Sequence, residues 1–174
     1  RASRIAAVDM LTGLLSRTAI IEQLQREIEL AHVRGTPLSV VFFDIDHFKR
    51  INDEHGHPVG DQSLRLVATR TRGKLRKHDF LGRYGGDEML VILPGTALDD
   101  ALTVAEHLRE AVNNRPLTID GRVIDTSLSL GVAQLGVGET FERLLERVDT
   151  ALYSSKSAGR DRVTGDLSPQ PGDA

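Results

Sequence analysis

The predicted fold depends most on the stretch Phe80-Leu81-Gly82-Arg83-Tyr84-Gly85-Gly86-Asp87-Glu88-Met89-Leu90-Val91-Ile92-Leu93. Two short β-prone runs joined by a Gly-Gly pair are typical of a hairpin. Glycine tolerates the positive φ of a tight turn and lets another molecule approach the backbone closely. The adjacent acids Asp87 and Glu88 repel each other unless a cation or solvent lies between them. Alone, such a tip is more often a solvated acidic turn than a site, so the rest of the chain decides.

Hydrophobic periodicity on both sides of this hairpin predicts the other elements. Residues 38–43 form an almost continuous apolar run, which is typical of a central strand covered on both faces. A second small hairpin is indicated around Asp120-Gly121, and residues 126–133 read as a further strand. The predicted helices have apolar stripes along residues 20–31, 64–75, 101–112 and 141–152, the second capped by Asp61 or a neighbour and the last by Thr140.

The predicted order is therefore helix, strand, helix, hairpin, helix, strand, helix. Its core, βαββαβ, predicts an α+β fold: a ferredoxin-like sheet with flanking helices on one face, plus the extra small hairpin. In that topology the end of the first strand and the tip of the central hairpin lie side by side.

The composition limits the class of protein. A chain of 174 residues is about one domain, and it has no Cys for a disulfide or a thiolate metal site. The net charge of −3 and the aromatic content of 4% argue against nucleic-acid binding. No apolar run approaches the ~20 residues that span a bilayer. We expect a cytoplasmic domain with no membrane segment, although the full-length protein could be membrane-anchored.

We expect a single domain over residues 9–165. Residues 1–8 are interpreted as the end of a linker from a longer protein, and residues 166–174, which are rich in Pro and Gly, as a disordered tail.

Acidic residues follow the first predicted strand. Asp44 and Asp46 are two apart, so they share a face if the strand continues that far. Asp46 can alternatively cap the next short helix. With Asp87 placed opposite by the fold, Asp44 could hold Mg²⁺, which prefers one or two carboxylates plus substrate phosphates. This arrangement predicts a nucleoside triphosphate site.

Other polar residues fit the same chemistry, and each also has an ordinary interpretation. Lys49 could offset charge during phosphoryl transfer or be a solvated lysine. Asn52 and Asp61 could read a base edge, or be a turn residue and an N-cap. Lys156 and Arg160 could reach the β- and γ-phosphates, or complement a helix dipole.

Five separated motifs resemble those of the GGDEF domain, the catalytic domain of diguanylate cyclases, in the family order from about residue 9 to 164. They are Asp9-Met10-Leu11-Thr12-Gly13-Leu14-Leu15-Ser16-Arg17, Phe43-Asp44-Ile45-Asp46-His47-Phe48-Lys49-Arg50-Ile51-Asn52-Asp53, Gly56-His57-Pro58-Val59-Gly60-Asp61, Gly85-Gly86-Asp87-Glu88, and Ala151-Leu152-Tyr153 through Lys156 to Gly159-Arg160. A lone Gly-Gly-Asp-Glu is a weak signal, but five ordered motifs are specific. The resemblance implies a nucleotide-cyclase, palm-like form of the predicted fold.

The resemblance also implies a reaction. Two domains meet as a transient homodimer, each binds GTP with Mg²⁺ or Mn²⁺, and cyclic di-GMP and two pyrophosphates form. By motif position, Asp44, the Ile45 carbonyl and Asp87 would bind metal. The other implied roles are activation of the 3′-hydroxyl by Asp87 with Glu88 beside it, transition-state stabilisation by Lys49, guanine recognition by Asn52 and Asp61 with His57 near the nucleotide, and binding of the terminal phosphates by Lys156 and Arg160.

A product-binding motif of the family is present too. Arg76-Lys77-His78-Asp79 has the form Arg-x-x-Asp and lies five residues before Gly85, where the family's inhibitory product site lies. Arginine can bind a phosphate bidentately and stack on guanine; the alternative is a helix-terminal charge pair. Arg83 is a predicted contributor, and Arg109 a hypothetical second arginine.

Two positions depart from the family pattern. Met89 stands where the family has Phe, at a position expected to point into the core, and Met is a flexible apolar filler. Ser16 stands where Asn is usual, and either residue caps a helix well.

The main hypothesis is a cyclase domain that is the output module of a longer protein, with a sensor or receiver domain elsewhere. Two other functions compete with it. One is a non-catalytic domain that binds GTP or cyclic di-GMP as a regulatory module; such degenerate members usually lose signature acids, which this chain keeps. The other is a cyclase with a different product, either a mononucleotide or a mixed purine dinucleotide. Asp61 favours guanine, because a carboxylate suits its donors.

Overall fold

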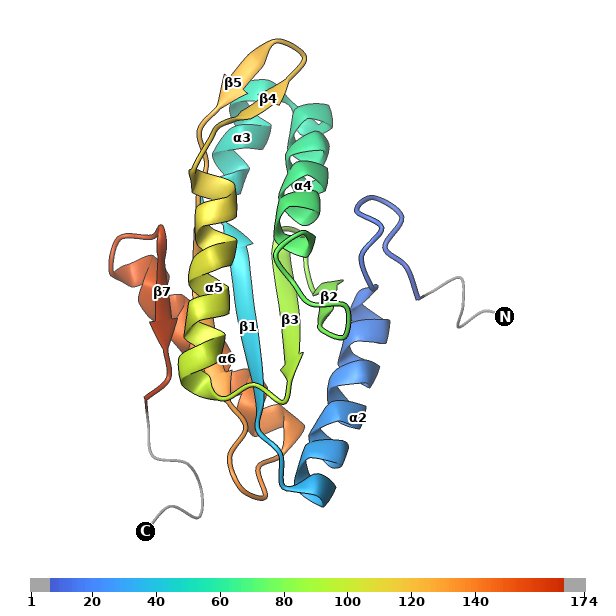
Figure 1. Ribbon diagram of the computed structural model, residues 1–174. Helices are drawn as coiled ribbons and strands as arrows, with labels where there is room; N and C mark the ends of the chain where they lie inside the picture. Colours follow the sequence, from blue (N-terminus) through green and yellow to red (C-terminus); the bar gives the residue numbers. More distant parts are fainter. Residues whose placement is uncertain (1–6, 168–174) are drawn as a thin grey trace.

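The computed structural model describes residues 7–167 and contains a five-stranded sheet between two layers of helices (Figure 1). Its elements in chain order are α2 (Arg17–Arg34), β1 (Leu38–Ile45), α3 (Phe48–His55), α4 (His57–Arg72), β2 (Phe80–Arg83), β3 (Glu88–Pro94), α5 (Leu98–Asn113), β4 (Leu117–Ile119), β5 (Arg122–Ile124), β6 (Leu128–Gln134), α6 (Phe141–Ser157) and β7 (Arg162–Gly165).

The sheet has the strand order β2-β3-β1-β6-β7, while β4 and β5 form a separate small hairpin. The neighbours are antiparallel except β7, which pairs in parallel with β6. The first four strands of this order are those of the predicted βαββαβ unit, so the ferredoxin-like fold is confirmed. In the β1–β3 register Asp44 faces Glu88. The end of β1 and the hairpin tip therefore lie side by side, as the topology predicts.

The prediction of helices on one face of the sheet is wrong. The alternating side chains of β1 enter two different clusters: Val41 and Phe43 pack with residues of α4 and α5, whereas Val40 and Phe42 pack with residues of α2 and α6. All eight residues of β1 are buried, so the strand needs cover on both faces. Since α2 and α6 lie outside the βαββαβ unit, that motif alone could not predict the second layer.

Several local predictions need correction. The segment after β1 forms the short helix α3, so Asn52 lies within a helix and is not a turn residue. Helix α4 begins at His57, so Asp61 lies within it and does not cap it. The edge strand β7 was not predicted, because Arg162–Gly165 has no alternating pattern. The predicted linker and tail, 1–8 and 166–174, lie largely outside the described residues, and the structure does not test them.

Three detailed predictions are confirmed. The Ser16 side chain caps α2 by accepting from the Ala19 N–H, and Thr140 caps α6 by accepting from the Arg143 N–H. Met89 is fully buried in the core, so it fills the position of the family's Phe.

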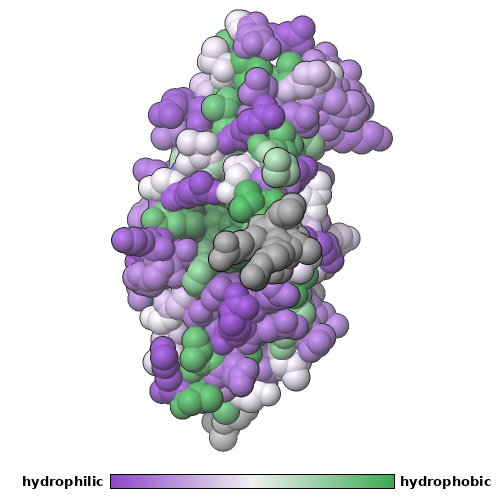
Figure 2. All heavy atoms as spheres, turned by 90° about the vertical axis from the view of Figure 1, so that its right-hand side faces the viewer, coloured by the Kyte–Doolittle hydropathy of each residue, from purple (hydrophilic) through white to green (hydrophobic). Residues whose placement is uncertain are grey.

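The outer surface of α2 is largely polar. Figure 2, which turns the right-hand side of Figure 1 to the viewer, shows a mostly hydrophilic face interrupted by hydrophobic patches. On α2 the apolar residues Leu30 and Val33 remain exposed, while Ile20, Leu24 and Ile28 are buried. Within residues 7–167, no helix combines the length and the hydrophobicity that a membrane span requires.

Helix α6 lies unusually close to the sheet at Gly131 of β6. A Cβ at this glycine would be 2.3 Å from the Leu152 nitrogen and 2.6 Å from the Val148 carbonyl oxygen. One turn further along α6, the Ser155 hydroxyl donates to the Leu130 carbonyl at 2.7 Å. This close contact carries the next residue, Lys156, to the end of the sheet where Asp44 lies.

We predict that Gly131→Ala lowers the free energy of unfolding by about 1–3 kcal/mol, because the added methyl group meets helix backbone that cannot move aside alone. Urea denaturation measures the change. Gly86→Ala is the control, since a Cβ there has no neighbour within 4 Å. Equal stability of these two variants would contradict the tight contact between α6 and the sheet.

Candidate functional site

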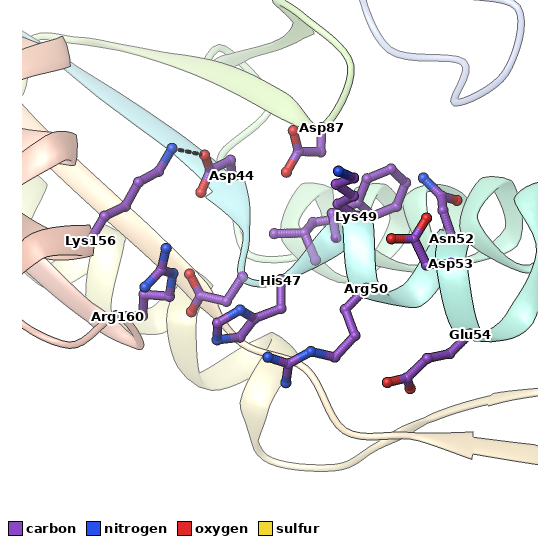
Figure 3. Close-up of a pocket in the computed structure, with 13 residues that line it drawn as sticks. Asp44, His47, Lys49, Arg50, Asn52, Asp53, Glu54, Asp87, Lys156 and Arg160 are labelled. Atoms are coloured by element: carbon purple, nitrogen blue, oxygen red, sulfur yellow. Dashed lines mark ion pairs between the residues drawn. The ribbon is translucent and has the colours of Figure 1, made fainter.

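A cavity of about 800 Å³ opens at the end of β1, between the hairpin tip, α3 and the end of α6 (Figure 3). This volume falls within the usual range for sites that bind small molecules. Its lining residues are Asp44, Ile45, Asp46, His47, Phe48, Lys49, Arg50, Asn52, Asp53, Glu54, Asp87, Lys156 and Arg160. The structure thus brings together seven of the residues that the sequence predicts for the site: Asp44, Ile45, Lys49, Asn52, Asp87, Lys156 and Arg160.

Asp44 lies at the centre of this cluster. It is 6% exposed and forms an ion pair with Lys156 of α6. Figure 3 shows Lys156 on one side of Asp44 and Asp87, from the hairpin, on the other. Glu88 faces Asp44 across the β1–β3 pair. Like charges directly opposite each other destabilise a sheet, so Lys156 offsets a repulsion that the register of the strands imposes.

The three carboxylates have perturbed acidities. Burial raises the pKa of Asp44 to about 6 and Lys156 opposes this rise, while Asp87 and Asp46 add to it. Burial also raises the pKa of Asp87 and that of Glu88. Burial lowers the pKa of Lys156, but Asp44, Asp87 and Glu88 raise it more, and the net shift is upward. The carboxylates therefore carry more negative charge than Lys156 neutralises, which favours a further cation.

The hairpin tip that carries Asp87 is held by backbone and arginine contacts. The N–H groups of Tyr84 and Gly85 donate to the Glu88 carbonyl at 2.8 and 3.2 Å. A Cβ at Gly85 would be 2.2 Å from the Glu88 side-chain oxygen, so a larger residue there would displace this carboxylate. Arg83 donates to the carbonyls of Gly85 and Gly86 and forms an ion pair with Asp9 at 3.2 Å. These contacts fix the tip in place beside β1.

Arg83, a predicted contributor to the product site, does not line the cavity that contains Arg76. Its guanidinium bonds to the hairpin and to Asp9, and its part in the product site stays a prediction. Sequence reasoning missed Asp9 and Arg17 as residues that support the hairpin. Arg17 donates to the Tyr84 carbonyl at 2.8 Å and lies over the Tyr84 ring. These contacts span more than 60 residues of chain, and no local pattern signals them.

Helices α3 and α4 place Lys49 and the predicted base-binding residues. Lys49 and Asn52 lie on α3 and line the main cavity. A Cβ at Gly60 of α4 would be 1.8 Å from the Asn52 side-chain oxygen, so this glycine lets the amide lie against α4. Asp61, the next residue, is exposed, and neither Asp61 nor His57 lines the cavity. Both are thus beside the Asn52 end of the site and outside its main cavity.

The Arg-x-x-Asp motif lies in the connection between α4 and β2, so it is not helix-terminal. The Arg76 guanidinium donates to Asp79 at 2.7 Å, and also to the Pro94 carbonyl and the Thr96 hydroxyl at 3.0 Å. Arg76 and Asp79 line a second cavity of about 410 Å³ together with Arg72 and Lys77. This cavity is separate from the one around Asp44.

Arg109 does not join Arg76 within the chain. It forms ion pairs with Glu106 at 2.5 Å and with Asp161 at 2.9 Å, and it lines a different cavity from Arg76. Because both carboxylates raise the pKa of Arg109, its charge is already satisfied. The structure thus does not support Arg109 as the second arginine of a product site in one chain.

The carboxylates fit a divalent cation that substrate phosphates complete. Among residues 7–167 there is no group of three or more His, Asp, Cys or Glu side chains that could hold a metal alone. Mg²⁺ does not require such a cage, because one or two carboxylates and phosphate oxygens suffice. Asp44, Ile45 and Asp87 line the same cavity, where the two carboxylates and the Ile45 carbonyl can offer oxygen atoms. These donors are hard oxygens, as Mg²⁺ and Mn²⁺ prefer.

Comparison with known proteins shows extensive similarity. Residues 6–162 match the family described as "Diguanylate cyclase, GGDEF domain". The chain is 42% identical to diguanylate cyclase DgcP of Pseudomonas aeruginosa over 91% of this chain and 24% of that protein. It is 40% identical to the cyclic di-GMP phosphodiesterase NbdA of the same organism, over 92% of this chain and 20% of that protein. The chain thus spans a quarter or less of the length of these two relatives.

A solved structure agrees with this match. The GGDEF domain of DgcB from Caulobacter crescentus, in complex with c-di-GMP, superposes with a TM-score of 0.90 and 37% sequence identity, covering 94% of each chain.

We predict opposite effects of acid on stability and on cation binding. The folded pKa of Asp44, about 6, exceeds its unfolded value of 3.8, so the folded protein binds more protons between them. The ligand-free protein should gain about 1 kcal/mol from Asp44 between pH 7.5 and 5. Over the same range Mn²⁺ binding should weaken, because the cation needs the ionised carboxylate.

Urea denaturation of the wild type and of Asp44→Asn at both pH values isolates the contribution of Asp44 to the free energy of unfolding. The Asp44→Asn protein should lose this pH-dependent contribution. Asp53→Asn, at an exposed position of the same cavity, should respond to pH as the wild type does. Identical pH responses of the Asp44→Asn protein and the wild type would refute the prediction.

Proposed function

Because this chain belongs to the GGDEF family of diguanylate cyclase domains, we propose that it condenses two molecules of GTP into cyclic di-GMP and two pyrophosphates. The observation that carries this proposal is the meeting of Asp44 and Asp87 in one cavity with cationic residues on both sides, Lys49 from α3 and Lys156 from α6. Such a cavity can hold a metal-bound triphosphate. In the reaction, each 3′-hydroxyl oxygen forms a bond to the α-phosphorus of the other GTP. The bond between that phosphorus and the oxygen that bridges to the β-phosphate breaks, and pyrophosphate leaves.

Asp44, Asp87 and the Ile45 carbonyl are the proposed ligands of Mg²⁺ or Mn²⁺. A bound divalent cation would neutralise the triphosphate and polarise its α-phosphoryl group. Asp87, whose pKa burial raises, is the proposed acceptor of the 3′-hydroxyl proton, because a raised pKa brings a carboxylate closer to the working pH of a base. Glu88, beside it on the strand, is the proposed second acid.

The cationic residues around the cavity would bind the phosphates. Lys49 at the start of α3 would stabilise the charge of the transition state, while Lys156 and Arg160 would hold the terminal phosphates. Lys156 must then leave its ion pair with Asp44 as nucleotide and metal enter. Asn52 and Asp61 would read guanine, with His57 near the nucleotide, at the end of the cavity where α3 meets α4.

One cavity of this kind holds one GTP, and the reaction needs two. We therefore propose a transient homodimer whose two cavities face each other, so that the rate depends on protomer concentration. Since the chain spans a small part of its curated relatives, a sensor or receiver domain elsewhere in the protein is the proposed source of control. GTP as substrate suggests a cytoplasmic site of action.

We further propose that cyclic di-GMP inhibits the enzyme at the Arg76–Asp79 cavity. Arg72, Arg76 and Lys77 give this cavity a cationic lining that suits a phosphate. Asp79 now holds the Arg76 guanidinium in place. The product would exploit this fixed geometry without touching the catalytic cavity.

The competing function is a non-catalytic module that binds GTP or cyclic di-GMP. This chain is also similar to NbdA, a relative that is named for phosphodiesterase activity and not for cyclase activity. The non-catalytic module therefore stays as the alternative. Retention of Asp44, Asp87 and Glu88 in one cluster favours the cyclase. Turnover distinguishes the two functions.

We predict that the purified chain, incubated with GTP and Mg²⁺, yields cyclic di-GMP and pyrophosphate at a rate that rises faster than linearly with protein concentration. Asp87→Ala should lower this rate about 100-fold or more, because a metal ligand and proton acceptor is lost. Glu54→Gln, in the same cavity, should keep the rate. Chromatography identifies the products. Tight GTP binding without turnover at any concentration would favour the non-catalytic module.

We predict that Arg76→Ala raises the inhibition constant for cyclic di-GMP about 10-fold or more and changes the initial rate less than about twofold, since one bidentate phosphate contact is lost outside the catalytic cavity. Inhibition curves at increasing product concentration provide the measurement. His78→Ala, in the same motif but outside the lining, is the control. Superimposable curves for the Arg76→Ala protein and the wild type would rule out the inhibitory site.

A further inference from the structure

Asp46 is a buried carboxylate that the proposed chemistry does not use. It follows β1 directly and is 6% exposed. Its Oδ1 accepts from the Ser129 hydroxyl at 2.5 Å, and its Oδ2 accepts from the Ser127 hydroxyl at 2.6 Å. The same Oδ2 also accepts from the backbone N–H of Asp161 at 3.0 Å. A buried charge with three donors is a built feature, because a buried carboxylate without partners is strongly destabilising.

These hydrogen bonds tie three separate parts of the chain together at the cavity. Ser127 directly precedes β6 and Ser129 is its second residue, while Asp161 follows α6, 115 residues after Asp46. The backbone N–H of Asp46 also donates to the Ser127 carbonyl at 2.9 Å. Asp46 therefore connects the end of β1, where Asp44 lies, with the turn that carries Arg160.

This turn has a backbone conformation that needs support. Arg160 and Asp161 have φ angles of 65° and 47°, in the left-handed region that non-glycine residues rarely adopt. Such residues persist where their surroundings hold them. The Arg160 N–H donates to the Ser155 carbonyl at 2.9 Å, and the Asp161 side chain accepts from Arg109 and Asn113. Asp46 supplies the hydrogen bond on the cavity side of the turn.

We propose that Asp46 is a positioning residue of the cyclase: through the Asp161 N–H, it holds the turn in the conformation that presents Arg160 to the terminal phosphates. This inference rests on the proposed function, which assigns Arg160 to the triphosphate. Asp46 and Arg160 line the same cavity. Because Asp46 bonds to the residue that follows Arg160 in the turn, we expect its effect on nucleotide binding to pass through Arg160.

Two other roles for Asp46 fit the structure less well. It does not cap α3, because the N-cap is His47 and no side chain bonds to the first turn. A role as a metal ligand would require Asp46 to give up its protein donors, since both of its oxygens already accept from them. The two roles differ in whether catalysis needs the negative charge of Asp46: a metal ligand needs the charge, whereas a positioning residue needs only the hydrogen bonds.

The pair Asp46→Asn and Asp46→Ala separates geometry from charge. An Asn amide can keep its oxygen toward Ser127 and the Asp161 N–H, and its NH₂ can donate to Ser129, because a hydroxyl both donates and accepts. We expect the Asp46→Asn protein to keep the wild-type KM for GTP within about threefold. Asp46→Ala should raise KM about 10-fold with kcat within about threefold, as for a lost charge-assisted phosphate contact. Equal loss of kcat in both variants would instead indicate a metal ligand and overturn the proposal.

Binding measurements test the connection to Arg160. By calorimetry, the Asp46→Ala protein should bind a non-hydrolysable GTP analogue about 10-fold more weakly and bind GMP unchanged, because GMP lacks the terminal phosphates. The variants Asp46→Ala and Arg160→Ala should be non-additive when combined, since one acts through the other. Additive losses, or equal weakening for GMP, would overturn the positioning role.

Two controls keep the inference separate from the proposed function. If the wild type binds no GTP analogue, the proposed function fails; if it binds and the folded Asp46→Ala protein binds equally well, only the role of Asp46 fails. Urea denaturation checks that the variants fold. If Asp46→Ala does not fold, Asp46→Ser retains a hydroxyl for the two serines but is too short for the Asp161 N–H, and the same loss is expected. Wild-type affinity in the folded Asp46→Ser protein would overturn the inference.

Discussion

The repulsion between carboxylates at the end of the central sheet is the constraint on which the rest of the structure depends. The β1–β3 register sets Asp44 against Glu88, and the hairpin adds Asp87 beside them. Burial makes this charge costly, and it is partly offset by Lys156, which reaches Asp44 because α6 packs directly on Gly131. A nucleotide-bound cation would replace Lys156 at Asp44 and release it for phosphate.

The fold holds these unfavourable features with contacts that are distant in sequence. His47 and Arg160, which both line the cavity, adopt left-handed backbone conformations. Asp46 joins the end of β1 to the turn after α6, while Arg83 ties the hairpin to Asp9. Strained backbone and buried charge gather at functional sites because the surrounding structure over-determines them.

Much of the fold was predictable because hydrophobic periodicity reports directly on burial. The run before Asp44 predicted a strand covered on both faces, and the stripe on α5 predicted its inward side. The second helical layer was not predictable from the βαββαβ unit. Nor was β7, since its pairing with β6 is parallel and its residues do not alternate. For the site, ordered motifs indicated Asp44, Asp87 and Lys156, but not the contacts among them.

The sequence by itself determined most of the elements, the residue types of the site and the family, because these follow from local patterns and ordered motifs. Only the tertiary structure decided which charges meet. It placed Lys156 on Asp44, committed Arg83 and Arg109 to other partners, and gave Asp46 its three donors. The physical reason is that hydrogen bonds and ion pairs act over a few ångströms in space. Their partners here lie up to 115 residues apart in the chain, where no local pattern records them.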